Sequence, residues 1–200
     1  MGLGLVLCLI TFVVVGIVIF QAQFAARKWR QVVKEGDIGA LSQLIDDTFD
    51  EWRRRRPARD RLLAEWNALQ SVGLVAANHS GIRVSLLAEP AMTVTDGKPS
   101  QSLEVETIGL RALIGTVERL MYEMPHVSFA RVQVDVYTEY RSVVSGNDLI
   151  CLMSCKIDRE QVAHSDWDSS SVEETAKDWP IEFGKNGKIL DPELGALCFS

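Results

Sequence analysis

The sequence predicts an α+β domain carried by a single transmembrane helix at its N-terminus. Three observations support this prediction. An uncharged apolar run opens the chain, two stretches with an apolar period of 3.6 residues follow it, and short alternating stretches typical of strands fill much of the rest. We therefore expect an N-terminal transmembrane helix, then a helical hairpin, and then a mostly antiparallel sheet with flanking helices.

The apolar run covers residues 3–20, and the first charged side chain after it is Arg27. Eighteen residues in a helix rise roughly 27 Å, which is close to the ~30 Å hydrocarbon core of a bilayer. A helix also satisfies its own backbone hydrogen bonds in lipid. The predicted organisation is a transmembrane anchor over 1–24, a juxtamembrane helix over 25–36 and a soluble α+β domain over 37–200.

Other N-terminal signals fit this segment poorly. A secretory signal peptide has a basic start and a shorter apolar stretch, whereas no basic side chain follows Met1 before the run. A lipoprotein cut before Cys8 would have to follow the large Leu7. Myristoylation of Gly2 expects Ser or Thr where Val6 stands. A membrane-spanning anchor is therefore the preferred interpretation.

Basic residues flank only the C-terminal end of the apolar run. Arg27, Lys28 and Arg30 follow it closely, and flanks of this kind are retained in the cytoplasm. The sequence therefore predicts a single-pass protein of the cell (inner) membrane, with its N-terminus outside and its C-terminal domain cytoplasmic. The four cysteines show no framework spacing, which agrees with a reducing compartment.

Two helices are predicted at the start of the soluble domain. Asp37 can cap a first helix that continues to about residue 55, and Pro57 ends it. A second helix is expected to continue to about Val72, with Gly73 as its cap. Each carries one apolar stripe, as in an antiparallel helical hairpin that covers a core.

The rest of the domain shows strand and helix patterns in turn. Asp96-Gly97, directly after the predicted strands 82–88 and 91–95, is a tight-turn signal, and the nearly apolar run 149–157 is typical of a central strand. Ser170 and Glu173 form a capping-box pattern before a short helix. The expected strands are 82–88, 91–95, 127–138, 149–157, 179–183 and 188–190, and the expected helices are 105–123 and 170–177.

Charge is unevenly distributed along the chain, whose net charge is −6. Residues 1–61 hold 10 Lys and Arg against 7 Asp and Glu, a balance of +3. Residues 62–200 hold 11 against 20, a balance of −9. An acidic body repels phosphate backbones, so no nucleic-acid partner is expected.

The chemistry-bearing residues do not form a recognisable catalytic or metal-binding pattern. The sequence contains no Gly-rich phosphate loop, and its three histidines are far apart. Cys151 and Cys155 lie four residues apart, which on a strand places them on one face but about 13 Å from each other, too far for one zinc ion. We interpret them as buried thiols that act as small hydrophobic groups. No catalytic residue, metal or cofactor is predicted.

One alternative is a membrane-tethered, metal-dependent hydrolase or nuclease. Asp135, Glu139, Asp148 and Lys156 lie on or beside two neighbouring predicted strands, an arrangement that resembles the PD-(D/E)xK nucleases. The resemblance implies that the carboxylates would hold Mg²⁺ and the lysine would polarise a phosphate. The sequence departs from that pattern, because Ser154 stands where the second carboxylate belongs.

The four consecutive arginines Arg53–Arg56 are the most distinctive polar feature. They can form a solvated helix end, a basic collar against anionic lipid headgroups, or a docking site for an acidic patch of a partner. The expected lipid or partner contacts are Arg27, Lys28, Arg30, Arg53, Arg54, Arg55 and Arg56.

These features favour a membrane-anchored cytoplasmic interaction or scaffold domain. Its expected role is to recruit or position a protein partner at the inner membrane face. The second alternative, beside the hydrolase, is an accessory subunit of a larger membrane complex.

Overall fold

The computed structural model describes residues 38–57, 62–95, 98–142, 146–165, 167 and 171–184. The predicted anchor, the juxtamembrane helix and the predicted strand 188–190 lie outside these residues, as do Arg27, Lys28 and Arg30. Every helix in the described ranges is too short or too polar to span a bilayer.

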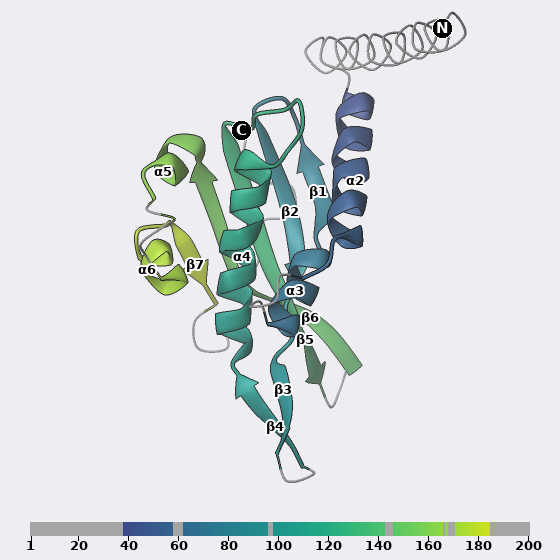
Figure 1. Cartoon of the computed structure of the whole chain (residues 1–200), viewed down its shortest axis with the longest axis vertical. Coiled ribbons are helices and arrows are strands. Elements are labelled where there is room, and N and C mark those ends of the chain that lie inside the picture. The colour runs from purple at the N-terminus through teal and green to yellow at the C-terminus, as the bar shows by residue number, and fades with distance from the viewer. Residues whose placement is uncertain are drawn as a thin grey trace, which may run out of the picture.

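The described elements are five helices and seven strands (Figure 1). The helices are α2 (Ile38–Arg54), α3 (Leu63–Gln70), α4 (Val105–Tyr122), α5 (Arg159–Ala163) and α6 (Val172–Lys177). The strands are β1 (Gly73–Ala77), β2 (Gly81–Leu87), β3 (Ala91–Thr95), β4 (Lys98–Leu103), β5 (Arg131–Ser142), β6 (Gly146–Asp158) and β7 (Ile181–Phe183).

A five-stranded mixed sheet forms the centre of the domain, in the order β1-β2-β5-β6-β7. Three neighbouring pairs are antiparallel, whereas β2 and β5 are parallel. Parallel strands need a long crossover connection, and the chain makes it through the separate β3–β4 hairpin and α4 (Figure 1). The α+β class predicted from the sequence is confirmed, with a parallel pair inside the sheet.

One face of the sheet is apolar and packs against α4. Val134 and Val136 of β5 are fully buried on this face, and Met153 of β6 lies beside them. Gly109 brings α4 close to the sheet, because a Cβ at this position would lie only 3.1 Å from Val136 Cγ1. The apolar alternation in β5, which predicted a half-buried strand, therefore marks the face covered by α4.

A buried cation joins α4 to the two preceding helices. Arg119 of α4 is 8% exposed, and its Cζ lies 5.6 Å from the ring centroid of Trp52 in α2 and 5.1 Å from that of Trp66 in α3. A desolvated cation over aromatic rings contributes about 2 kcal/mol. The two predicted helices are present, but α3 packs more extensively against α4 than against α2.

Several local predictions need correction. Gly73 begins the edge strand β1 instead of capping a helix, and α3 is limited to eight residues. The polar segment of β4 carries no strand pattern, but it pairs with β3, and Thr95 opposite Lys98 confirms the predicted tight connection. The predicted capping box lies one residue later, where the Glu174 amide donates to Ser171 Oγ at 3.3 Å.

Candidate functional site

Arg53, the first of the four consecutive arginines, holds the junction of α2, α3 and β1 together. Its guanidinium donates to Val72 O at 2.7 Å, to Gln70 O at 3.3 Å and to Asp50 Oδ1 at 2.8 Å. The Gln70 side-chain amide donates in return to Arg53 O at 2.9 Å. These bonds satisfy carbonyl groups at the ends of both helices. The donors of Arg53 are therefore used inside the domain.

Arg55 joins the end of α2 to the end of α4. Its Nη1 lies 2.6 Å from Glu123 Oε2, and its Nη2 lies 3.0 Å from Glu51 Oε1. The hydrogen bonds that Arg55 donates, first to Glu51 and then to Glu123, raise the pKa of its guanidinium above the ordinary value. Arg55 is half exposed, but its charge is already matched by these two carboxylates.

Arg54 and Arg56 are different from their neighbours. Both are exposed, and neither makes a hydrogen bond or ion pair with another residue that the structure describes. Leu62 and Leu63, at the start of α3, are 43% and 68% exposed. We call these four residues the arginine–leucine patch. It comprises two available cations at the end of α2 and two exposed apolar side chains at the start of α3.

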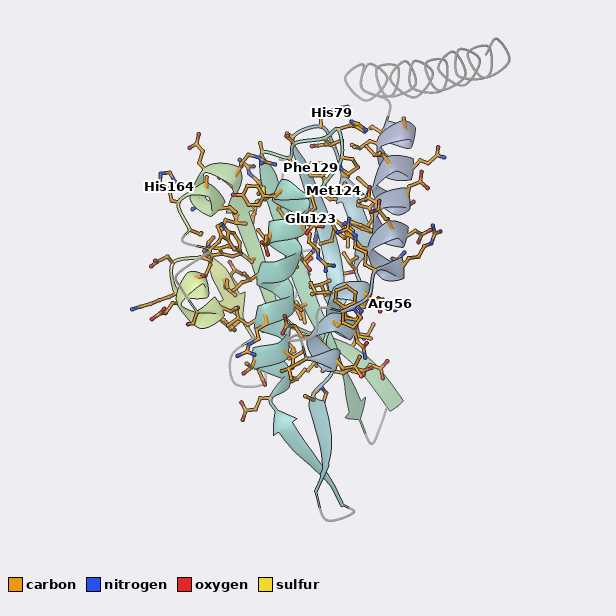
Figure 2. All side chains as sticks on the ribbon, viewed as in Figure 1. Arg56, His79, Glu123, Met124, Phe129 and His164 are labelled. Atoms are coloured by element: carbon orange, nitrogen blue, oxygen red, sulfur yellow. The ribbon has the colours of Figure 1, made fainter. Side chains whose placement is uncertain are left out.

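The arginine–leucine patch lies at the end of α2 that is far from its first residue. Sixteen helical steps separate Ile38 from Arg54, which is roughly 24 Å along the axis. Figure 2 shows Arg56 near this far end, with His79 of the β1–β2 turn near the opposite end. The patch is therefore displaced from the point where the chain enters the domain.

The face of the sheet opposite α4 carries a buried polar cluster around Asp135. Arg83 Nε donates to Asp135 Oδ2 at 2.7 Å, and the two side chains are 4% and 1% exposed. Ser154 Oγ donates to Asp135 Oδ1 at 2.5 Å, and Gln133 Nε2 donates to the same oxygen at 3.2 Å. Strand register places Gln133 opposite Arg83 and Ser154 opposite Asp135. Three donors thus stabilise the Asp135 carboxylate.

Cys151 and Cys155 are both buried on β6, as predicted, but they lie on opposite faces. The register shifts between Val136 and Tyr137, so that Leu152 is an extra residue in β6. Burial, followed by the charge of Asp135, raises the pKa of Cys151 to about 12. Burial alone raises the pKa of Cys155 to about 12. The bulge therefore corrects the prediction that these thiols share a face, while their interpretation as inert groups agrees with these pKa values.

The residues of the hydrolase alternative do not converge. Asp148 pairs with Tyr140, whereas Ser154 is the residue opposite Asp135. Six strand positions therefore separate Asp148 from the level of Asp135, which is roughly 20 Å. Lys156 is exposed, pairs with Gln133 and lies two positions beyond Ser154 in β6. Among the described residues, no group of three or more His, Cys, Asp or Glu side chains is placed to hold a metal ion.

A hollow of about 560 Å³ lies between α5 and α6 and is predominantly acidic. Glu160, Glu174 and Asp178 line it together with His164 and Trp179. His164 and Arg56 lie on opposite sides of the molecule in Figure 2. The hollow thus presents negative charge far from the arginine–leucine patch.

No protein-family model matches this chain, and no curated protein or solved structure is significantly similar to it. The function must therefore be inferred from the site. Sequence reasoning selected the arginines of the patch but missed Leu62 and Leu63, because apolar residues at the start of a helix are ordinarily buried. It also missed Arg83 and Gln133, which gain a shared partner only through strand register.

Proposed function

We propose that this chain is a membrane-anchored interaction domain that positions a protein partner at the inner membrane face through its arginine–leucine patch. The anchor is the apolar segment within residues 1–24, and the basic residues Arg27, Lys28 and Arg30 orient it. The folded domain then presents the patch to the cytoplasm.

The observation that carries the proposal is the unequal use of four consecutive arginines. Arg53 and Arg55 are matched by carbonyl groups and carboxylates of the domain. Arg54 and Arg56 are exposed without a described partner, and Leu62 and Leu63, which follow residues 58–61 in the chain, are exposed as well. Arginine and apolar side chains together are typical of protein interfaces, in which a few residues supply most of the binding energy.

A protein partner fits this patch better than a lipid surface does. Anionic headgroups contribute about 1 kcal/mol for each cation held near them, and the two available cations Arg54 and Arg56 would together give roughly a 30-fold preference. The attraction falls off over about 8 Å at physiological ionic strength. The patch lies at the end of α2 away from Ile38, where the chain arrives from the anchor. The basic residues 27–30 remain the expected lipid contacts.

The proposal does not include a catalytic step. The hydrolase alternative requires Asp135 and Asp148 to lie close together, and the strand register places them several residues apart along the sheet. The accessory-subunit alternative shares the requirement for a protein partner, but it places the contact in the transmembrane segment. A variant of the patch can therefore distinguish the two.

The test is crosslinking in native membranes followed by purification of the full chain. We expect a defined partner to be recovered with the wild-type chain and lost with the Arg54→Gln/Arg56→Gln double variant. The control is Lys156→Gln/Lys177→Gln, which removes two exposed cations elsewhere and changes the net charge equally. Recovery of the same proteins with all three chains would contradict the proposal and favour a contact through the membrane span.

A further inference from the structure

We infer that the exposed face of α2 binds the same face of a second copy of this chain, with the two helices antiparallel. This inference rests on the proposed function, because it names the partner that Arg54 contacts as another copy of the chain. It commits to that occupant, so a different protein and a lipid surface become outcomes of the test.

The exposed face of α2 carries negative charge in its middle and positive charge at its end. Five exposed polar residues, three or four positions apart, form one stripe along the helix. They are Gln43, Asp46, Asp47, Asp50 and Arg54. The buried residues of α2 lie on the other side of the helix and join the hydrophobic core. Because α2 lies at one side of the domain, beside β1 (Figure 1), the stripe faces outward.

Most of the charges on this stripe are not used inside the domain. Asp46, Asp47 and Arg54 make no hydrogen bond or ion pair with another residue that the structure describes. Asp50, in contrast, is already matched, because its Oδ1 lies 2.8 Å from Arg53 Nη1. The stripe therefore presents two available carboxylates and, roughly 10–12 Å further along the helix axis, one available cation.

This order of charges is complementary to itself when one of two helices is reversed. If two α2 helices lie antiparallel about a two-fold axis at Asp50, Arg54 of each copy lies level with Asp46 and Asp47 of the other. Near the axis, each Asp50 carboxylate is paired with Arg53 of its own chain. A two-fold contact repeats every interaction, so both Arg54 side chains are matched at once. Parallel helices would instead place like charges side by side, which is unfavourable.

A second copy in the same membrane suits this stripe better than a partner of one charge sign. A purely acidic or purely basic partner would leave part of the stripe unmatched or repelled. Exposed ion pairs contribute little between free proteins, but copies anchored in one bilayer, as proposed above, meet at a high effective concentration. Their two-fold axis then follows the membrane normal, so the antiparallel α2 helices lie parallel to the membrane surface.

The experiment measures energy transfer between donor-tagged and acceptor-tagged copies of the full chain in phosphatidylcholine vesicles. We expect the wild type to associate. Arg54→Glu alone and Asp46→Arg/Asp47→Arg alone should each lower the association constant about tenfold or more, because like charges then meet. A mixture of these two variants, one with each tag, should restore association, because every reversed residue meets its complement in the other chain. A folding defect cannot produce this rescue.

Lys177→Glu is the matched control, because Lys177 is the exposed last residue of α6 as Arg54 is of α2. It changes the net charge equally and should leave association unchanged. The inference is overturned if the wild type does not associate, if the control weakens association as much as Arg54→Glu does, or if the mixture stays dissociated. It is also overturned if phosphatidylserine in the vesicles abolishes association, because headgroups would then occupy Arg54.

Failure of this inference can be separated from failure of the proposed function. If crosslinking in native membranes requires Arg54 and Arg56 but recovers a different protein and no second copy, the interaction domain stands and only the identity of the partner is wrong. If crosslinking is independent of both arginines, the proposed function itself fails.

Discussion

The buried ion pair between Arg83 and Asp135 allows a demanding test of the fold, because the chain contains a matched surface pair. In both pairs an arginine Nε lies 2.7 Å from an aspartate oxygen. Arg83 and Asp135 are 4% and 1% exposed, whereas Arg131 and Asp158 are 40% and 52% exposed. Asp135→Asn and Asp158→Asn therefore make the same chemical change at equal distance, and the two aspartates differ in burial and in the further donors, Ser154 and Gln133, that only Asp135 has.

We expect a large difference in the free energy of unfolding between the two variants. Removing one partner of a buried pair leaves an uncompensated charge and costs about 3–5 kcal/mol. An exposed pair contributes about 0–1 kcal/mol. Asp158 also precedes α5 as its N-cap residue, and Asn caps a helix as well as Asp does. The surface variant is therefore expected to remain close to the wild type.

The assay is urea unfolding of the full chain in detergent, followed by tryptophan fluorescence. With a slope of about 2 kcal/mol per molar urea, a loss of 4 kcal/mol lowers the midpoint by about 2 M for Asp135→Asn. Asp158→Asn should lower it by less than about 0.5 M. If Asp135→Asn does not fold, Arg83→Met/Asp135→Leu should restore folding, because it removes both buried charges together.

Equal midpoints for the two single variants would refute this reasoning. That result would mean that water reaches the Arg83–Asp135 pair, and that the polar face of the sheet is solvated. Failure of the charge-free double variant to improve on an unfolded Asp135→Asn would refute it as well, because the uncompensated charge would then not be the cause.

Two further predictions concern α4 and the thiols of β6. In the same urea assay, Gly109→Ala should have a free energy of unfolding about 1–2 kcal/mol lower than that of Gly115→Ala. The new Cβ at position 109 would lie 3.1 Å from Val136 Cγ1, whereas the new Cβ at position 115 would make only ordinary van der Waals contacts. Equal stability would show that α4 can shift away from the sheet. Cys151 and Cys155, whose pKa values are raised to about 12, should resist iodoacetamide at pH 8 until the domain is unfolded, as peptide mapping would show. Because the folded-state pKa is the higher one, their contribution to stability is complete below the ordinary pKa of 9.0 and is lost as pH rises from 9 toward 12.

The sequence predicted the elements whose pattern is set by local burial. The apolar stripe of α2 and the alternation of β5 each record one buried face, and both elements are present. Elements formed by pairing alone were not predictable. The polar β4 exists because β3 lies beside it, and the short β1 lies at the sheet edge, where burial leaves little pattern.

The parallel pairing of β2 with β5 was also hidden from sequence reasoning. After α4 the chain can place its next strand beside the strand that directly precedes the helix or beside an earlier strand. The apolar pattern of α4 is the same in both cases. Here β2 and β5 become neighbours, with Arg83 opposite Gln133 and Ser85 opposite Asp135. The contact between Arg83 and Asp135 follows from this register, because the two residues are 52 positions apart in the chain.

The candidate site shows a different limit, because four identical residues in a row look equivalent in sequence. Arg53 and Arg55 differ from Arg54 and Arg56 because groups later in the chain bind them. Arg53 donates to Val72 O, and Arg55 pairs with Glu123. These bonds fix the end of α2 against α3 and α4. Arg54, between the two bonded arginines, and Arg56, after them, stay exposed. Removing Arg53 or Arg55 would therefore disturb the patch indirectly.

The same geometry determines which variants can test function. Gln at Arg54 or Arg56 removes a charge that no described group of the domain uses, so the fold should be retained. Gln at Arg53 would leave the carbonyl groups of Gln70 and Val72 without their donor, and any loss of binding could then follow from loosening of the α2–α3 junction. A charge-neutralising scan across the whole run would mix these two effects. A variant of Arg54 and Arg56 must therefore be compared with a variant of Arg53 and Arg55 to separate loss of partner binding from loss of folding.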